Sequence, residues 1–210
     1  MRTAVLSSSP VLVRWLALDE VDRGWHGYLD EGERDRYEAK SSEADRTRFL
    51  GAAALMRQVA AELAGCPVAE VGLHRSCPDC GEPHGRPVPT GGATGWHVSA
   101  SHSGPHVLVG GAGRPVGVDV EVVRADLPSA RLLGRVLAPG EAQPADSEGF
   151  AHLWAAKEAY LKAIGTGLAL SMSRVLIEEG EVGLTDGSRP AGRVTRLDAP
   201  AGCVGWLCEL

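Results

Sequence analysis

The apolar residues of the chain recur with a helical period in two segments. In Asp45–Ala64 and again in Phe150–Ile164 they return every three or four residues, which is typical of a helix that buries one face. Gly65 follows the first segment and Gly165 the second, and glycine commonly ends a helix. The pattern therefore predicts two long amphipathic helices, one in each half of the chain.

Strands are predicted where apolar residues alternate or cluster between Gly, Pro and acidic residues. In Pro115–Val123 the even-numbered valines point to one face, and Asp119 and Glu121 point to the other. Shorter strands are predicted at Val11–Leu18, Trp96–Ser101, His106–Gly110, Ser173–Ile177, Arg193–Leu197 and Cys203–Glu209. The remaining segments are predicted as a helix-rich surface segment (Asp30–Asp45), a loop region (Cys77–Gly95) and a helix (Pro128–Leu137).

The order of these elements is similar in the two halves of the chain. Each half contains a strand, a long helix and further strands, although no internal repeat is evident in the residues themselves. This order predicts an α/β (α+β) fold built from two similar halves, residues 1–104 and residues 105–210.

Composition and charge narrow the class of protein. The 210 residues are 44% apolar and 23% charged, which is ordinary for a globular chain. The net charge of −6 is shared equally by the two halves, so no basic nucleic-acid-binding domain is expected. Five cysteines, an odd number, favour a reducing compartment, and no apolar run approaches the ~18 residues of a membrane span. We expect a cytoplasmic protein without a membrane segment.

Three carboxylates have the spacing of a metal site. Asp119 and Glu121 share one face of their strand, and Glu158 lies on the second predicted helix. Oxygen ligands of this kind suit Mg²⁺, with Mn²⁺ as the alternative ion, and Mg²⁺ is often bound together with substrate phosphates. Lys162 follows Glu158 at i+4, and it is one of only three lysines beside 18 arginines. The plainer interpretations are a solvated strand surface and an exposed helix ion pair.

Several residues could bind the phosphates that such a metal site implies. Ser101 and His102 follow a predicted strand, Arg46 lies at the start of the first helix, and Arg86 lies in a loop between Gly85 and Pro87. The plainer interpretations are a surface turn histidine for His102 and a solvated arginine for Arg46. No P-loop, dinucleotide fingerprint or zinc-protease helix is present.

The ordered set of motifs resembles the two-halved, Sfp-type 4′-phosphopantetheinyl transferases. The set consists of Arg46, Gly85-Arg86-Pro87, Ser101-His102-Ser103, Gly117-Val118-Asp119-Val120-Glu121 and Trp154-Ala155-Ala156-Lys157-Glu158-Ala159-Tyr160-Leu161-Lys162. The resemblance extends from about Asp45 to Leu170. The strand motif and the helix motif are specific together and weak apart.

The resemblance implies an activity and a partner. Enzymes of this family transfer the phosphopantetheine arm of coenzyme A to a serine of an acyl or peptidyl carrier protein and release adenosine 3′,5′-bisphosphate. The resemblance implies two halves related by a pseudo-twofold axis, with coenzyme A in the cleft between them. The first half would carry the nucleotide contacts and the second the Mg²⁺ and the catalytic groups. It also implies that a monomer is active.

The resemblance also implies a role for each site residue. Asp119, Glu121 and Glu158 would hold the metal ion, and Glu158, as ligand, base or both, would accept the proton of the carrier serine. Lys162 would contact the phosphates. Arg46 and His102 would bind the 3′-phosphate, whereas Arg86 and Ser101 would line the nucleotide pocket. Glu141 matches a further acidic position of the family only loosely, and the register of residues 30–40 leaves no residue assigned there.

Two other hypotheses remain. The first is a non-catalytic module of the same fold that binds coenzyme A or a carrier protein. The second is an interaction protein stabilised by zinc, with Cys77, Cys80 and His84 as ligands and Cys66 as a fourth. The second hypothesis explains none of the three carboxylates, and the plainer interpretation of the cysteines is a turn with two reduced thiols.

Overall fold

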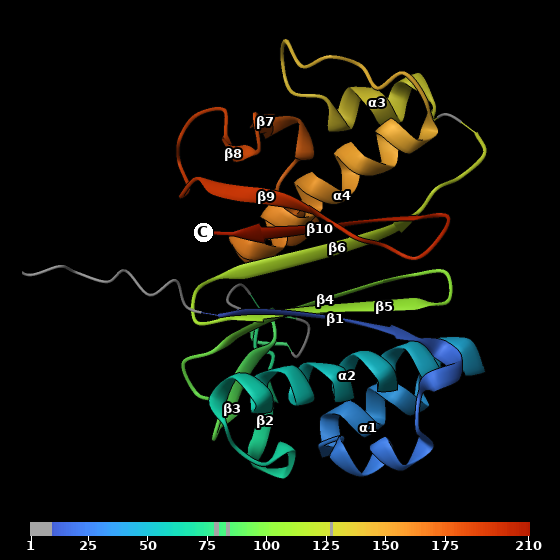
Figure 1. The fold of residues 1–210 in the computed structure, drawn as a ribbon, viewed down its shortest axis with the longest axis vertical. Coiled ribbons are helices and arrows are strands. Elements are labelled where there is room, and N and C mark those ends of the chain that lie inside the picture. Colours follow the sequence, from blue (N-terminus) through green and yellow to red (C-terminus); the bar gives the residue numbers. More distant parts are fainter. Residues whose placement is uncertain (1–9, 78–79, 83–84, 127) are drawn as a thin grey trace, which may run out of the picture.

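Two antiparallel sheets lie side by side at the centre of the molecule, and a long helix covers the outer side of each (Figure 1). The computed structural model describes residues 10–77, 80–82, 85–126 and 128–210. The first sheet has the strand order β1-β5-β4. Its strands are β1 (Val11–Ala17), β4 (His97–Ser103) and β5 (His106–Ala112).

The second sheet has five strands in the order β6-β10-β9-β8-β7. They are β6 (Val116–Val122), β7 (Val175–Glu178), β8 (Glu181–Leu184), β9 (Gly192–Leu197) and β10 (Cys203–Glu209). A separate hairpin pairs β2 (Val71–His74) with β3 (Val88–Gly91). The α-helices are α1 (Glu31–Glu38), α2 (Glu43–Ala64), α3 (Ala130–Val136) and α4 (Ser147–Ala163). Short 3₁₀ helices are η1 (Leu18–Glu20), η2 (Arg23–Tyr28), η3 (Val68–Glu70), η4 (Gly167–Ala169) and η5 (Met172–Arg174).

The two long helices begin and end at residues that satisfy free backbone groups. The Ser42 hydroxyl accepts the Asp45 N–H at the start of α2, and the Asp146 carboxylate accepts the Gly149 N–H at the start of α4. Gly65 ends α2 with a positive φ of 67°, a conformation that glycine adopts without strain. Both predicted helices are confirmed, and both begin a few residues earlier than their apolar pattern.

Apolar cores hold these layers together. One lies between α2 and the first sheet, and one lies between α4 and the second sheet. A third joins the sheets to each other and contains Leu108 of β5, Leu207 of β10 and the valines at 116, 118 and 120 of β6. The predicted valine face of β6 is therefore confirmed as a core face. The α/β fold class is confirmed as well, whereas the similarity of the two halves stays a prediction.

Some local predictions differ from the structure. The segment Cys77–Gly95 was predicted as loop alone, but β3 lies within it, because four pairs with β2 suffice to form a short ladder without a clear apolar pattern. The strands β2 and β8 were not predicted for the same reason. The charged segment at residues 30–45 does form a helix, but its Glu33 is buried and pairs with the buried Arg57 of α2. The expected division after residue 104 falls in the turn between β4 and β5, which both belong to the first sheet.

Among the described residues, no helix is long and apolar enough to cross a membrane.

Candidate functional site

The strand β6 and the helix α4 bring three carboxylates together. Asp119 and Glu121 lie two apart on β6, and Glu158 lies on α4, which packs directly over this strand. Gly117 permits this packing, because a Cβ atom at that position would lie 1.9 Å from the backbone oxygen of Ala159 on α4. Each carboxylate offers one oxygen that lies within 4.8 Å of those of the other two.

Asp119 is buried and its two oxygens have different environments. Its Oδ1 accepts a hydrogen bond from the Ser101 hydroxyl at 2.6 Å and another from the Lys162 ammonium at 2.7 Å. Its Oδ2 is buried without a hydrogen-bond partner among the described residues. A buried, unpaired carboxylate oxygen is costly, so this atom needs a positively charged or hydrogen-bonding partner.

The crowding of negative charge perturbs the other two acids. Burial, followed by the charges of Asp119 and Glu158, raises the pKa of Glu121 to about 7. Burial and the charge of Asp119 also raise the pKa of Glu158, against the opposing effect of Lys162, whose Nζ lies 3.9 Å from its Oε1. Lys162 thus provides one positive charge beside three acids. The cluster is neither a solvated strand surface nor an exposed ion pair.

The donor set fits a divalent cation. The three acids supply hard oxygen ligands, and the unpartnered Asp119 Oδ2 is an atom that a cation would satisfy. Within residues 10–77, 80–82, 85–126 and 128–210, no other group of three His, Cys, Asp or Glu side chains is close enough to share a metal ion.

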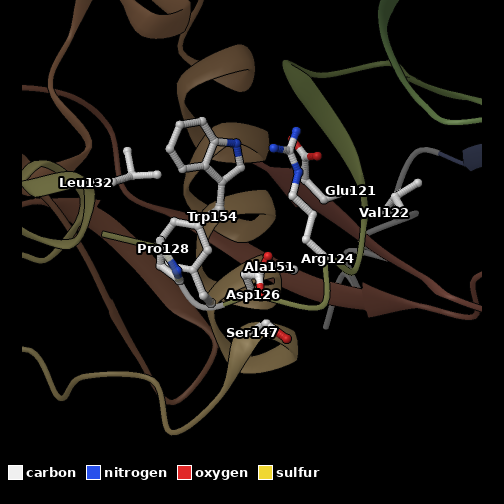
Figure 2. Close-up of a pocket in the computed structure, with 10 residues that line it drawn as sticks. Glu121, Val122, Arg124, Asp126, Pro128, Leu132, Ser147, Ala151 and Trp154 are labelled. Atoms are coloured by element: carbon white, nitrogen blue, oxygen red, sulfur yellow. The ribbon is translucent and has the colours of Figure 1, made fainter. Parts of the chain in front are cut away.

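A cavity of about 380 Å³ opens beside this cluster (Figure 2). Glu121 and Arg124 lie on one side of it, and Trp154, Leu132 and Pro128 lie on the other. Val122, Asp126, Ser147, Phe150 and Ala151 complete the lining. This apolar pocket, as we call it, combines mostly carbon-lined walls with one of the candidate metal ligands at its edge.

A second cavity, of about 510 Å³, lies between α2, the segment after α1 and the end of β4. Four basic side chains line this cationic pocket: Lys40, Arg48, Arg75 and His102. Its apolar lining includes Phe49, and the Lys40 ammonium lies 5.5 Å from the centre of the Phe49 ring. The pocket is suited to an anionic ligand that has an apolar, planar part.

Electrostatics support this interpretation of the cationic pocket. Burial, followed by the charge of Arg36, lowers the pKa of Arg75 to about 10, and the buried Nε of Arg75 has no hydrogen-bond partner among the described residues. Partial removal from water lowers the pKa of His102, and the charges of Arg48 and Lys162 add to this effect. Asp45 also lines the pocket and forms an ion pair with Arg48 at 2.7 Å, so its carboxylate offsets part of this positive charge.

The residues predicted to bind the nucleotide are not all in this pocket. His102 lines it. Arg46 does not: it lies 3.8 Å from Glu43, and its Nε has no partner among the described residues. Arg86 bridges the two halves, because its Nη1 donates a hydrogen bond to the Ala163 carbonyl at the end of α4 and its Nη2 lies 3.0 Å from His97 Nδ1 of β4. Ser101 faces Asp119.

Two further motif residues have structural partners. The buried Lys157 ammonium donates to the carboxylate of Glu141 and to the carbonyls of Val136 and Met172. Glu141, which matches the family motif only loosely, therefore pairs with Lys157 and lies outside the carboxylate cluster. Of the hypothetical zinc ligands, Cys77 is buried and Cys80 exposed, Cys66 lies beside Gly92, and His84 lies outside the described residues.

Sequence comparisons place these features in a family. The pattern of the 4′-phosphopantetheinyl transferase superfamily matches residues 115–201, which include β6 and α4. A Synechocystis protein named for this activity is 30% identical over 74% of the chain, and a 4′-phosphopantetheinyl transferase of Bacillus pumilus is 30% identical over 69%. Over these residues the chain is similar to 4′-phosphopantetheinyl transferases. A 4′-phosphopantetheinyl transferase of Bacillus subtilis is 29% identical over 77% of the chain and 79% of its own length.

The resemblance to phosphopantetheinyl transferases found in the motifs is thereby confirmed. The matches cover 65% of the length of the Synechocystis protein and 66% of that of the Bacillus pumilus protein, just under two thirds. The residues that sequence analysis missed are Lys40, Arg48 and Arg75 in the cationic pocket and the lining of the apolar pocket. The bias towards arginine hides Arg48 and Arg75, whereas Lys40, one of three lysines, carries a compositional signal.

Proposed function

We propose that this protein transfers the 4′-phosphopantetheine arm of coenzyme A to a serine of an acyl or peptidyl carrier protein and releases adenosine 3′,5′-bisphosphate. The carboxylate cluster of Asp119, Glu121 and Glu158, with Lys162 beside it, is the observation that carries the proposal. The name of the family and the names of the relatives support it.

The two pockets and the cluster form a path for coenzyme A. The cationic pocket would take the nucleotide with its 3′-phosphate, because it offers four basic side chains and an aromatic ring. The charge of Lys162 contributes to the lowered pKa of His102, so Lys162 lies near this pocket. The pyrophosphate, which follows the nucleotide in coenzyme A, would therefore pass by Lys162. Glu121 belongs to both the cluster and the apolar pocket, so the uncharged pantetheine arm would enter that pocket.

This path assigns the nucleotide contacts and the reacting groups to different halves of the chain. The lining of the cationic pocket ends at residue 102, and the three carboxylates lie between residues 119 and 158. We therefore propose that residues 1–104 supply most nucleotide contacts and that residues 105–210 supply the chemistry. Because one chain provides every part of this path, a monomer would suffice.

The residues of the cluster suggest how the reaction proceeds. Asp119, Glu121 and Glu158 would hold Mg²⁺ or Mn²⁺, which when bound stabilises the charge of the pyrophosphate. The carrier serine Oγ forms a bond to the β-phosphorus of coenzyme A as the bond from that phosphorus to the bridging oxygen breaks. Glu158 accepts the serine proton, and Lys162 stabilises negative charge on the leaving bisphosphate.

Mass spectrometry of an intact carrier protein tests this function. An apo carrier would be incubated with coenzyme A, Mg²⁺ and this protein, beside a Glu158→Ala variant and a sample with EDTA. We expect a gain of one phosphopantetheine on the carrier, lost in both controls. No gain on fatty-acid, polyketide or peptide carriers, with coenzyme A still bound, would instead support the non-catalytic binding module.

A further inference from the structure

Three alternating serines of β4 face the strand β6 of the neighbouring sheet. Ser99, Ser101 and Ser103 are odd-numbered residues of β4, and all three form hydrogen bonds with β6. The even-numbered Ala100 and His102 instead line the cationic pocket. Because side chains alternate along a strand, β4 presents one face to the cationic pocket and the other to the carboxylates.

The hydroxyls of Ser99 and Ser103 accept backbone hydrogen bonds from β6, as the carbonyls of a neighbouring strand do within a sheet. β4 and β6 belong to different sheets (Figure 1), yet the Val118 N–H donates to Ser99 Oγ at 3.1 Å and the Val122 N–H donates to Ser103 Oγ at 3.0 Å. These bonds fix the position of β6 against the first sheet. Ser99 contacts the backbone alone, so its role is structural.

The other two serines donate to the candidate metal ligands. Ser101 is buried and donates to Asp119 Oδ1 at 2.6 Å, and the half-buried Ser103 donates to Glu121 Oε2 at 3.3 Å. Together with Lys162, Ser101 gives Asp119 Oδ1 two donors, whereas Oδ2 has none among the described residues. Two donors on one oxygen fix the rotation of the carboxylate and leave the other oxygen free for a cation.

We propose that Ser101 is a positioning residue of the cation site, which orients Asp119 so that Oδ2 is its ligand, with Ser103 in the same role for Glu121. This inference rests on the proposed function, because it assumes that the cluster binds a divalent cation. It differs from the role that the family resemblance implies for Ser101, which is to line the nucleotide pocket. Partners that orient metal ligands commonly affect metal affinity strongly.

Titration with Mn²⁺, followed by electron paramagnetic resonance of the free ion, measures the effect. The full-length protein would be saturated with coenzyme A and compared with Ser101→Ala, Ser101→Thr and Ser99→Ala. We expect the Ser101→Ala variant to bind Mn²⁺ about 10-fold more weakly. Ser101→Thr keeps the hydroxyl and should restore most of the affinity. Ser99→Ala, the matched control from the same strand, removes a hydroxyl that contacts only the backbone of β6 and should weaken Mn²⁺ binding much less than Ser101→Ala does.

A second titration separates the two roles of Ser101. In EDTA, the affinity for adenosine 3′,5′-bisphosphate should be the same for the wild type and for Ser101→Ala. A lower nucleotide affinity with unchanged Mn²⁺ affinity would overturn the proposal in favour of a nucleotide contact. If Ser101→Ala does not fold, Ser101→Cys replaces it, because the thiol has similar size but is a weak donor, and the same loss of Mn²⁺ affinity is expected.

The wild-type protein distinguishes failure of this inference from failure of the proposed function. If the wild type neither binds Mn²⁺ nor modifies a carrier, the proposed function is wrong, and the role of Ser101 at a cation site falls with it. If the wild type does both and Ser101→Ala binds Mn²⁺ equally well, only the positioning role is wrong.

Discussion

The two charged regions of the molecule are assembled in opposite ways. The acidic cluster comes from two neighbouring elements, β6 and α4, and all three of its acids are at least partly buried. The cationic pocket is assembled from four separate places in the first half: the segment after α1, the helix α2, the residue that follows β2 and the strand β4. The acidic cluster is compact and largely buried, whereas the cationic pocket is wide and open to solvent at His102.

This difference indicates what each region contributes. A compact set of like charges is unstable by itself and becomes stable when a cation binds, so it is suited to hold a metal ion in one position. A wide set of basic groups attracts a large anion, and each group contributes only part of the affinity. We therefore expect substitutions in the acidic cluster to abolish the reaction and substitutions in the cationic pocket to weaken substrate binding.

The largest expected effect is at Glu158. Glu158→Gln keeps the shape of the side chain but removes its charge and its ability to accept a proton, so we expect carrier modification to slow by about 10²–10⁴-fold. The rate of mass gain on an apo carrier measures this. Glu148→Gln on the same helix is the matched control, because Glu148 is exposed and pairs with Arg196 and His152. Equal rates for the two variants would remove Glu158 from the mechanism.

Lys157 lies next to Glu158 on α4, but we expect its charge to contribute to the stability of the fold. Its buried ammonium has three partners, Glu141 and two carbonyls, and none of them belongs to the acidic cluster. Lys157→Met removes the cation beside the Glu141 carboxylate, which keeps its hydrogen bond from the Ala138 N–H, so we expect the free energy of unfolding to fall by about 3–5 kcal/mol. Urea unfolding followed by circular dichroism measures the loss.

A double variant distinguishes the ion pair from simple packing. If the loss comes from an unpaired carboxylate, Lys157→Met combined with Glu141→Leu should recover part of the stability. A double variant less stable than Lys157→Met would show that the side chains act by packing.

A smaller effect is expected in the cationic pocket. Arg75→Met removes a largely buried cation with an unpartnered Nε, and we expect the Kd for adenosine 3′,5′-bisphosphate to rise about 10-fold. Isothermal titration calorimetry measures this. Arg46→Met is the informative comparison, because Arg46 does not line the pocket although the family resemblance assigns it to the 3′-phosphate. A rise for Arg46→Met alone would favour the assignment from resemblance over the geometry.

The same contrast explains what could be predicted from the sequence. Asp119 and Glu121 share a strand face, and Glu158 and Lys162 share a helix face, so local periodicity already brings each pair together. The contact between the two pairs requires Gly117, whose position in the motif is visible in the sequence but whose clearance from α4 is not. The acidic cluster was therefore found almost completely.

The cationic pocket was found only in part, because its residues are far apart in the sequence. Arg46 and Arg48 lie two apart on α2, and residues at that spacing do not share a helix face. Nothing in a segment rich in arginine shows which of them faces the pocket. The short strands β2 and β8 were missed for a related reason: they are held by pairing with neighbours and have little periodicity of their own.

The smallest expected effect is the pH dependence of metal binding by the acidic cluster. The pKa of Glu121 is raised to about 7, so near neutrality this acid is partly protonated in the metal-free protein. A cation binds the deprotonated form, so affinity for Mn²⁺ should rise by about threefold between pH 6.5 and pH 7.5. In Glu121→Gln this dependence should be weaker, and an unchanged slope would show that another group controls it.

The same shift predicts how the metal-free fold responds to pH. A raised pKa means that the folded state binds more protons at Glu121 than the unfolded state does between the ordinary value of 4.5 and about 7. Its contribution to stability is therefore complete at acid pH and is lost as the pH rises through this range. In EDTA, the Tm of the wild type should fall more from pH 5 to pH 7.5 than that of Glu121→Gln. Excess Mg²⁺ should reduce the difference, because the cation stabilises the ionised cluster that protonation otherwise relieves.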